Sequence, residues 1–549
     1  MEFRFSSNPG LPKLAWCATV DRTTGMVTLV HGPLVEVRSH FFIEGVWNGA
    51  FEEGDFGDTD CVFGTGGIVG DHSVRFVTSA ATIDYLYYKD NRQDVTVSNS
   101  LPLLLAAIGD ALDPQCLEYP KICNSVMDGI NEYLKDIPTK NGTVRRITYR
   151  NLNVSREQIW ESDKSLPPTF KCFEDYQKFL TQNYATIAAN ARSSARTHPI
   201  EILSTQSTGY DTTAVNSIAR PHGIDKVFTV SKAKSNFHLA HNDDGNLPDD
   251  DGGSICQALG LKFIRLNRKA FVDEFDQEDL YYSTLHHNQD ANLKDIAKYI
   301  KNVSLLLTGT YGSIWDTKKA FSNRVVLDSD LKRSDLSTHG LSEFRLVVGF
   351  IQVPLPYMGA RRMKDIVNIT ESPEMDAWRL GNRYDRPIAR RIAEEAGVSR
   401  SLFGQSKKGS VVIFCAPSVP YGKALRKEFF DYLVAHKLMT RPMTWLWPIV
   451  RWINSILILK TENRFAVVHY TERLIYKLTG RPFEFKRLWS QRDGLLFCFC
   501  VNRTARAYSS ALGDIAVDSL KGSEPFSSLE VSQFQKLRQG GQQRTSAVY

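Results

Sequence analysis

The stretch "LSTQSTGYDTT", residues 203–213, decides how this sequence is interpreted. It follows the apolar run "IEIL" and precedes "AVNSIARPHG", whose apolar positions have helical spacing. A polar loop between a buried strand and a helix has two uses. Asp211 or Thr212 can cap the helix by accepting a hydrogen bond from a first-turn amide. Alternatively, the unpaired first-turn amides bind a phosphate, with hydroxyl donors beside them and an aspartate suited to magnesium.

Strand-like and helical patterns alternate around this loop. The runs "PIEILST", "KVFTVS", "KFIRL" and "VSLLLTG" are strand-like, and helical patterns separate them, one of them near 293–301. Such alternation predicts a parallel, doubly wound sheet with helices on both faces, which binds its ligand beyond the carboxyl ends of its strands. The polar segments "STQSTGYD", "TVSKA" and "TGTYGSIWD" all follow strands. Their convergence favours the phosphate interpretation over the helix cap.

Composition narrows the class of protein. Hydrophobic residues make up 42% of the 549 residues and charged residues 23%, which is ordinary for a globular protein of more than one domain. A net charge of +6 is small for this length and does not favour a nucleic-acid partner. The nine cysteines show no C-x-x-C spacing, so neither a zinc ribbon nor a disulfide framework is expected. A cytoplasmic location is the default expectation.

The patterns predict a mixed architecture, α/β and α+β, in four parts. These are a β-rich domain at 1–150, a parallel-sheet domain at 151–420, a helical or mixed extension at 421–519 and a disordered tail at 520–549. Five further local expectations accompany them. The motif "GTGGIVG" at 64–70 is interpreted as a hairpin turn, 151–200 and 320–440 as mainly helical, and "FCFC" near 498 as a strand. The apolar run 443–459 contains a proline and a central arginine, which favours a core or interfacial helix over a membrane span.

These segments, in this order, resemble the asparagine synthetase-like family, whose synthetase domain is an adenine-nucleotide α-hydrolase fold of the N-type ATP pyrophosphatase kind. "STGYDT" resembles the family's pyrophosphate loop S-G-G-x-D-S, with Thr208 in place of the first glycine. "FTVS" resembles the strand end under the adenine, and "TGTYGSIWD" the second phosphate-side segment, S-G-E-G-x-D-E. "YDRPI" resembles the R-x-P-F-L-D element, and "SLFGQSKKG" the stretch that carries a catalytic lysine. The resemblance spans about 170–415.

The resemblance implies an ATP-dependent, AMP-forming amide ligase. Such an enzyme adenylates a small-molecule or peptide carboxylate and transfers it to an amine or ammonia, using ATP and Mg²⁺. Lys407 or Lys408 is implied as catalytic, and Asp211 as a magnesium ligand. Asp316 is a second candidate ligand, because Ser313 stands where the family has an aspartate. The implied nucleotide-binding residues are Ser204, Ser207, Thr208, Gly209, Tyr210, Asp211, Thr212, Val230, Ser231, Gly309 and Ser313.

The first 150 residues resemble a degenerate form of the family's amidotransferase half. Glu2 stands where the family has its nucleophilic cysteine, and Cys17 is not placed to replace it, so no glutaminase activity is expected. Ser313 leaves a second hypothesis open, a catalytically impaired nucleotide-binding scaffold that acts on a partner protein. Two arginines near the "YDRPI" element, Arg383 and Arg386, are expected to pair with glutamates of the following helix, Glu394 and Glu395.

Overall fold

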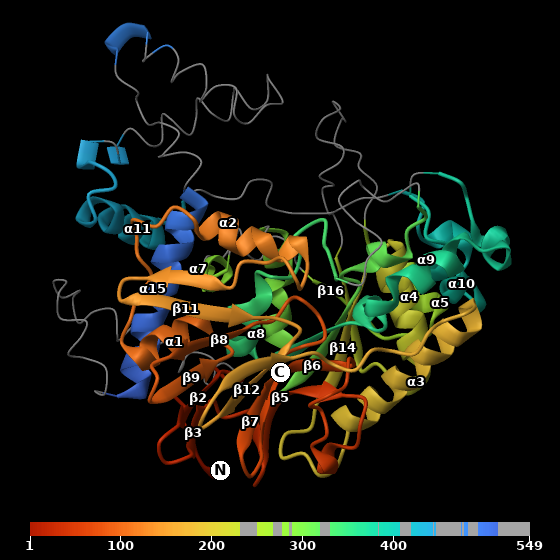
Figure 1. The fold of residues 1–549 in the computed structure, drawn as a ribbon. Helices are drawn as coiled ribbons and strands as arrows, with labels where there is room; N and C mark the ends of the chain where they lie inside the picture. Colours follow the sequence, from red (N-terminus) through yellow and green to blue (C-terminus); the bar gives the residue numbers. More distant parts are fainter. Residues whose placement is uncertain are drawn as a thin grey trace, which may run out of the picture.

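The structure is a computed structural model, shown in Figure 1. It describes residues 1–230, 250–266, 277–284, 288–318, 330–382, 384–406, 419–442, 444–445, 474, 477–480 and 492–513. The molecule is mixed α/β, with a β-rich N-terminal region and a parallel sheet farther along the chain. The expected tail at 520–549 and most of the run 443–459 lie outside the described residues. Within the described ranges, no helix is both long enough and apolar enough to cross a membrane.

The N-terminal region consists of two sheets packed face to face. Valines that alternate along β9, Val95 and Val97, enter a core shared with Phe42 and Phe76 of the other sheet. The first sheet has the order β1 (Glu2–Ser7), β3 (Met26–His31), β2 (Trp16–Asp21), β9 (Asp94–Ser98), β8 (Leu86–Asp90), β11 (Gly142–Ile147), β10 (Asp136–Thr139). The second has the order β13 (Ile159–Ser162), β12 (Asn151–Ser155), β7 (Ser73–Val77), β6 (Val62–Val69), β5 (Phe41–Trp47), β4 (Glu36–Val37).

Two sequence expectations in this region were wrong. The motif at 64–70 is not itself a hairpin turn, because residues 64–69 lie within strand β6 and only Gly70 enters the turn to β7. Its glycines permit close packing against β5: a Cβ on Gly66 would stand 2.3 Å from the carbonyl oxygen of Phe42. The segment after 150 is not helical at first, since β12 and β13 continue the second sheet to residue 162, and the predicted helix begins only at Phe173.

The second sheet system is five-stranded and wholly parallel. Its order is β16 (Phe263–Leu266), β15 (Lys226–Val230), β14 (Glu201–Gln206), β17 (Ser304–Thr308), β18 (Phe350–Pro354). Successive side chains of β17 enter different cores, Leu305 and Leu307 on one face and Leu306 on the other, so both faces are covered. Strand order reverses between β14 and β17, which is where such sheets open a crevice at their carboxyl edge. Strand β18 was missed in a region expected to be mainly helical.

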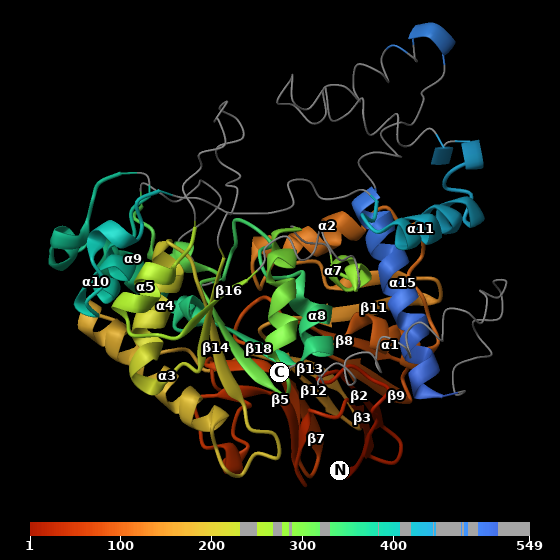
Figure 2. The same ribbon diagram turned by 180° about the vertical axis from the view of Figure 1, so that it is seen from behind.

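Helices lie on either side of this sheet. Figures 1 and 2 both place α3, α4 and α5 on one flank, and α7, α8 and α15 toward the other. The α-helices are α1 (Leu101–Ile108), α2 (Tyr119–Asn124), α3 (Phe173–Ala191), α4 (Tyr210–Ala219), α5 (Gly253–Ala258), α7 (Glu278–Tyr282), α8 (Leu341–Val348), α9 (Met363–Glu371), α10 (Pro387–Glu395), α11 (Lys423–Ala435) and α15 (Arg492–Leu512). The 3₁₀ helices are η1 (Phe51–Glu53), η2 (Ser125–Asp128), η3 (Arg220–His222), η5 (Asn288–Tyr299), η6 (Gly312–Trp315), η7 (Leu355–Tyr357), η8 (Ala360–Arg362), η9 (Pro373–Trp378) and η10 (Arg400–Leu402).

Helix α15 contradicts the strand expected at "FCFC". Cys498 and Cys500 are both fully buried, but they lie in a helix whose residues 494–502 are buried on every side, so no polar face there reveals its period. The helix packs against α1 of the N-terminal region. Its Asn502 accepts a hydrogen bond from the Leu112 amide at 2.8 Å and donates one to the Leu112 carbonyl at 3.0 Å.

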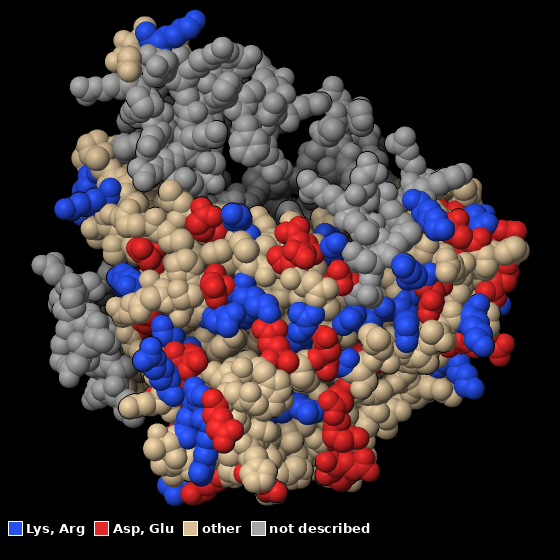
Figure 3. Space-filling model, viewed as in Figure 1, with Lys and Arg blue, Asp and Glu red and all other residues tan. Residues whose placement is uncertain are grey.

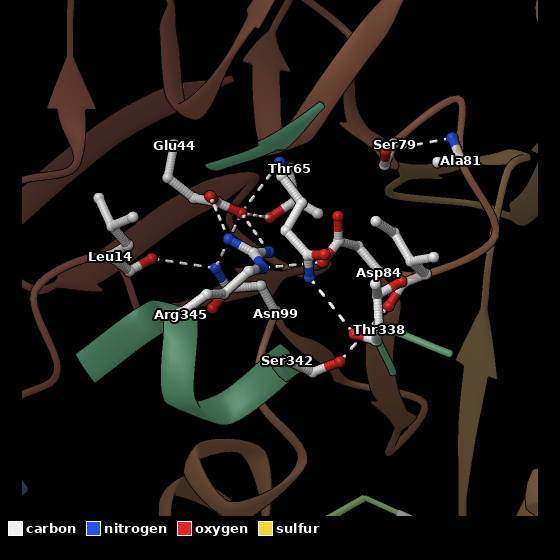
Figure 4. A network of polar contacts seen from close by, with 12 residues as sticks. Leu14, Glu44, Thr65, Ser79, Ala81, Asp84, Asn99, Thr338, Ser342 and Arg345 are labelled. Atoms are coloured by element: carbon white, nitrogen blue, oxygen red, sulfur yellow. Dashed lines mark hydrogen bonds and ion pairs between the residues drawn. The ribbon is translucent and has the colours of Figure 1, made fainter. Parts of the chain in front are cut away.

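A buried ionic network joins the N-terminal region to the helices of the parallel sheet (Figure 4). Arg345 of α8 contacts both carboxylate oxygens of Glu44 on β5, at 2.7 and 3.0 Å, and its Nε donates to Asp84 at 2.8 Å. Glu44 also accepts hydrogen bonds from the amide and hydroxyl of Thr65. Burial alone would raise the pKa of Glu44 and lower that of Arg345, but the facing charges keep the arginine protonated.

Candidate functional site

The candidate site is the loop 207–209 between the central strand β14 and helix α4. The backbone amides of this loop donate hydrogen bonds to side-chain oxygens. The Ser207 amide donates to the Thr212 hydroxyl at 3.0 Å, and the Gly209 amide donates to the Ser207 hydroxyl at 3.1 Å. Thr208 uses both its amide and its hydroxyl, at 3.0 and 2.7 Å, to donate to one carboxylate oxygen of Asp250. A carboxylate of the chain therefore occupies both donors of Thr208, a residue predicted to bind the nucleotide.

The first turn of α4 has no side-chain cap at its N-cap residue, Gly209. The Thr212 hydroxyl is turned back to Ser207, and the Asp211 carboxylate is turned to Arg386. The helix-cap alternative for these two residues is therefore not what the structure shows. An uncapped helix start, with partial positive charge on its amides, lies at the carboxyl edge of the sheet.

Arg386 is the central side chain of the site. It precedes Pro387, the first residue of α10, and its side chain is 5% exposed. Its Nη1 contacts Asp211 and its Nε contacts Asp316, the residue after η6. Burial would lower the pKa of Arg386, but the two carboxylates raise it well above its ordinary value, so the guanidinium stays charged. One cation thus links two carboxylates that were predicted as magnesium ligands.

The expected partners of Arg386 were wrong. Glu394 pairs with Arg400 at 2.5 Å, and Glu395 pairs with Arg391 at 2.7 Å. Arg386 instead contacts residues that precede it by 70 and 175 positions. An arginine immediately before a helix-starting proline is the only local signal of this position, and it does not identify partners so distant in sequence. Arg383 lies outside the described residues.

A second buried arginine lies behind Tyr210. Arg390 has no exposed surface, its Nη2 donates to the Tyr210 hydroxyl, and its guanidinium lies 4.9 Å from the centre of the Tyr210 ring. It also pairs with Asp385 at 3.6 Å. Burial raises the pKa of Tyr210 to about 12. Arg390 therefore fixes the first residue of α4 against α10 and was not anticipated from the sequence.

The segment after β17, residues 309–312, packs closely against Asp211. A Cβ on Gly309 would lie 2.6 Å from the Asp211 Cβ, and one on Gly312 would lie 2.2 Å from the Asp211 Cγ. Only glycine leaves room for this approach. The segments "STGYDT" and "TGTYGSIWD", which resemble the family's two phosphate-side segments, are therefore in contact. The contact involves Asp211 of the first segment and the two glycines of the second.

The remaining predicted site residues lie in several places. Ser204 is buried, and its hydroxyl donates to Asn216 of α4 at 2.5 Å, so it faces the helix inside the fold. Val230 is buried at the end of β15. Ser313 is half-buried within η6, and its carbonyl accepts the amide of Asp316 at 3.0 Å. Three predicted residues lie outside the described residues: Ser231, Lys407 and Lys408.

The described residues do not fit a resident magnesium ion. Asp211 and Asp316 are both already paired with Arg386. In the ranges given above, no group of three or more histidine, cysteine or acidic side chains is placed to hold a metal. Magnesium takes hard oxygen ligands in near-octahedral geometry, and a buried guanidinium between two carboxylates replaces that arrangement with an ion triad.

Two N-terminal residues bear on the expected lack of a nucleophile, Glu2 and Cys17. Glu2 begins strand β1, is exposed, and contacts Arg4 at 2.6 Å. Cys17 lies in β2, and burial raises the pKa of its thiol to about 12, so it stays protonated at neutral pH. The absence of glutaminase activity stays a prediction.

Comparisons with known proteins identify no relative of this chain. Neither the protein-family models nor the curated proteins include a match to the chain. The resemblance to the asparagine synthetase-like family is therefore supported only by the motifs quoted above.

Surface charge gives no sign of a large basic groove on the face drawn in Figure 3. On the described part of this face, lysine and arginine side chains are interspersed with acidic ones. A nucleic-acid groove instead needs clustered positive charge. The expected lack of a nucleic-acid partner stays a prediction.

Replacing Gly312 with alanine tests whether Asp211 is fixed by the β17 segment. The new Cβ overlaps the Asp211 carboxylate, so the Asp211–Arg386 pair must separate and the free energy of unfolding should fall by about 1–3 kcal/mol. Gly209→Ala is the matched control, since its Cβ would meet only the Ser207 hydroxyl at 3.2 Å and the Tyr384 hydroxyl at 3.5 Å. Urea unfolding measures both variants. Equal midpoints would show that Asp211 is free to move.

Proposed function

We propose that the chain binds an adenine nucleotide at the carboxyl edge of the parallel sheet, in a doubly wound domain of the asparagine synthetase-like type. We further propose that it acts as a catalytically impaired scaffold toward a partner protein. One observation carries the choice of a scaffold: Arg386 holds both carboxylates that the ligase chemistry would need for magnesium. The uncapped start of α4 at the strand-order reversal supports nucleotide binding there.

The charge balance explains why the chemistry is expected to be weak. Adenylation of a carboxylate places a second anion beside the triphosphate, and this repulsion must be neutralised in the transition state. In the described site, the positive charge of Arg386 is already shared by Asp211 and Asp316. The carboxylates that would recruit a metal are therefore not available to it.

The second candidate is the AMP-forming amide ligase without glutaminase activity. The close fit of Gly309 and Gly312 against Asp211 favours it, because the two phosphate-side segments meet as the resemblance implies. In this alternative Lys407 or Lys408 stabilises the charge that develops as the amine attacks. The proposed locations, cytoplasm for the protein and the sheet edge for the ligand, are the same for both candidates.

Two measurements separate these candidates. Calorimetric titration with ATP should show binding to the wild type and none to Gly209→Val, whose branched side chain covers the loop. Gly70→Val, in the β6–β7 turn, is the matched control and should bind normally. Incubation with ATP and Mg²⁺ across a panel of carboxylates and small peptides, with ammonia and amines, should release no AMP above a protein-free blank. Substrate-dependent AMP release would establish the ligase instead.

A further inference from the structure

We infer that the chain fills this site with its own ions: Arg386 takes the position of a divalent cation, and Asp250 takes the position of a phosphate oxygen. The inference rests on the nucleotide site proposed above and adds what regulates it. A ligand must displace Asp250 from Thr208 before its phosphate reaches the same donors. Asp250 thereby sets the affinity of the site for anions.

The cation half follows from the ion triad. The Arg386 side chain is 5% exposed, and the carboxylates it joins are 27% and 12% exposed, so the triad is partly withdrawn from water. Nε and Nη1 of Arg386 are both engaged by these carboxylates. A divalent cation that binds between the two carboxylates must displace the guanidinium that joins them, at the cost of breaking partly desolvated ion pairs. Binding of a free divalent cation in that position is therefore disfavoured.

The anion half follows from Thr208. Its amide and hydroxyl converge on one Oδ1 atom of Asp250, in the arrangement that a phosphate oxygen would adopt. Asp250 is 8% exposed, so water competes weakly with this contact. The neighbouring Asp251 points elsewhere, to the Gly253 amide at 2.8 Å and Arg265 at 2.6 Å. Two adjacent carboxylates of equal charge thus differ in whether they contact the loop.

That difference supplies the test of the anion half. Asp250→Asn weakens the internal acceptor, so affinity for inorganic pyrophosphate and for ATP should rise about tenfold or more, as expected for loss of a charge-assisted competitor. Asp251→Asn removes the same charge from the neighbouring position and should change affinity less than about threefold. Equal affinities for Asp250→Asn and the wild type, or weaker binding by Asp250→Asn, would overturn the inference.

Manganese titration, followed by electron paramagnetic resonance on nucleotide-free protein, tests the cation half. The wild type should bind no Mn²⁺ in the millimolar range, whereas Arg386→Met should gain a site. Arg400→Met, which removes an arginine paired with the single carboxylate Glu394, should gain none. Wild-type Mn²⁺ binding that Asp211→Asn abolishes would overturn this half, whether or not Arg386→Met folds. If neither the wild type nor Asp250→Asn binds ATP, the proposed function fails, and the manganese result still decides the role of Arg386.

Discussion

Replacing Arg345 with methionine is expected to lower the free energy of unfolding by about 3–5 kcal/mol, because it leaves two buried carboxylates without their counter-charge. Glu44 has no exposed side-chain surface and Asp84 has 2%, so water cannot replace the lost guanidinium. Methionine preserves most of the buried volume, so the loss of charge, rather than a cavity, dominates the effect. Urea unfolding monitored by tryptophan fluorescence reports on this region, since Trp16 and Trp47 are both buried in it.

Two further variants show whether the effect of Arg345→Met comes from the buried carboxylates. Arg145→Met removes an arginine whose partner, Asp136, is 69% exposed, and should cost no more than about 1 kcal/mol. The double variant Arg345→Met with Glu44→Gln removes one of the stranded charges and should recover part of the loss. An Arg345→Met midpoint as little changed as that of Arg145→Met would show that the network contributes nothing to stability.

Replacing Glu343 with glutamine is expected to change how stability depends on pH. This α8 carboxylate accepts hydrogen bonds from Ser100 at 3.0 Å and from Tyr508 of α15 at 2.6 Å. Burial raises its pKa from an ordinary 4.5 to about 7, against the lowering effects of these two hydroxyls and of Arg345. Asp279 adds a small further increase. The folded protein therefore holds this proton more tightly than the unfolded chain does.

The sign of the pH effect follows from that difference. Between about pH 4.5 and 7 the unfolded chain loses the proton while the folded protein keeps it, so the contribution of Glu343 to stability falls as pH rises. Glutamine cannot ionise. Relative to the wild type, Glu343→Gln should therefore gain about 3 kcal/mol on going from pH 4.5 to pH 8. Urea midpoints at several pH values measure the gain, and the exposed Glu132→Gln serves as control. A constant difference across this range contradicts the assignment.

Local sequence patterns predicted most strands of the parallel sheet. The elements that were missed or misassigned are specified by contacts between residues far apart in the sequence. The runs around the loop predicted β14, β15, β16, β17 and α4 correctly, because period and turn residues are properties of neighbouring positions. Strand β18 was missed because "FIQVP" is short and lies among helical segments, and its pairing with β17 specifies it. "FCFC" was misassigned because every side of α15 around it is buried, which removes the contrast that reveals a helix.

The residues of the candidate site also fall into two groups, those in recognisable sequence segments and those placed by contacts distant in sequence. Asp211 and Gly312 stand in recognisable segments, and the structure brings them together. Arg386 and Asp250 decide the charge of the site, but both act on residues 42 to 175 positions away. Sequence spacing carries no information about such contacts when a carboxylate and a guanidinium have many possible partners. The expected pairing of Arg386 with glutamates of its own helix was chemically reasonable. Those glutamates instead pair with other arginines, and Arg386 pairs with the two carboxylates at the sheet edge.

Helix α15 also has a consequence for the order in which the molecule is completed during synthesis. The amide and carbonyl of Leu112 are satisfied by Asn502, which follows 390 residues later. At about 5–20 residues per second, a ribosome needs roughly 20–80 s to add them. For that time α1, with Leu104 and Leu105 fully buried in the finished protein, has not received its final cover. The nascent chain therefore presents an apolar helix face long before its own partner exists, which gives a folding chaperone time to act there.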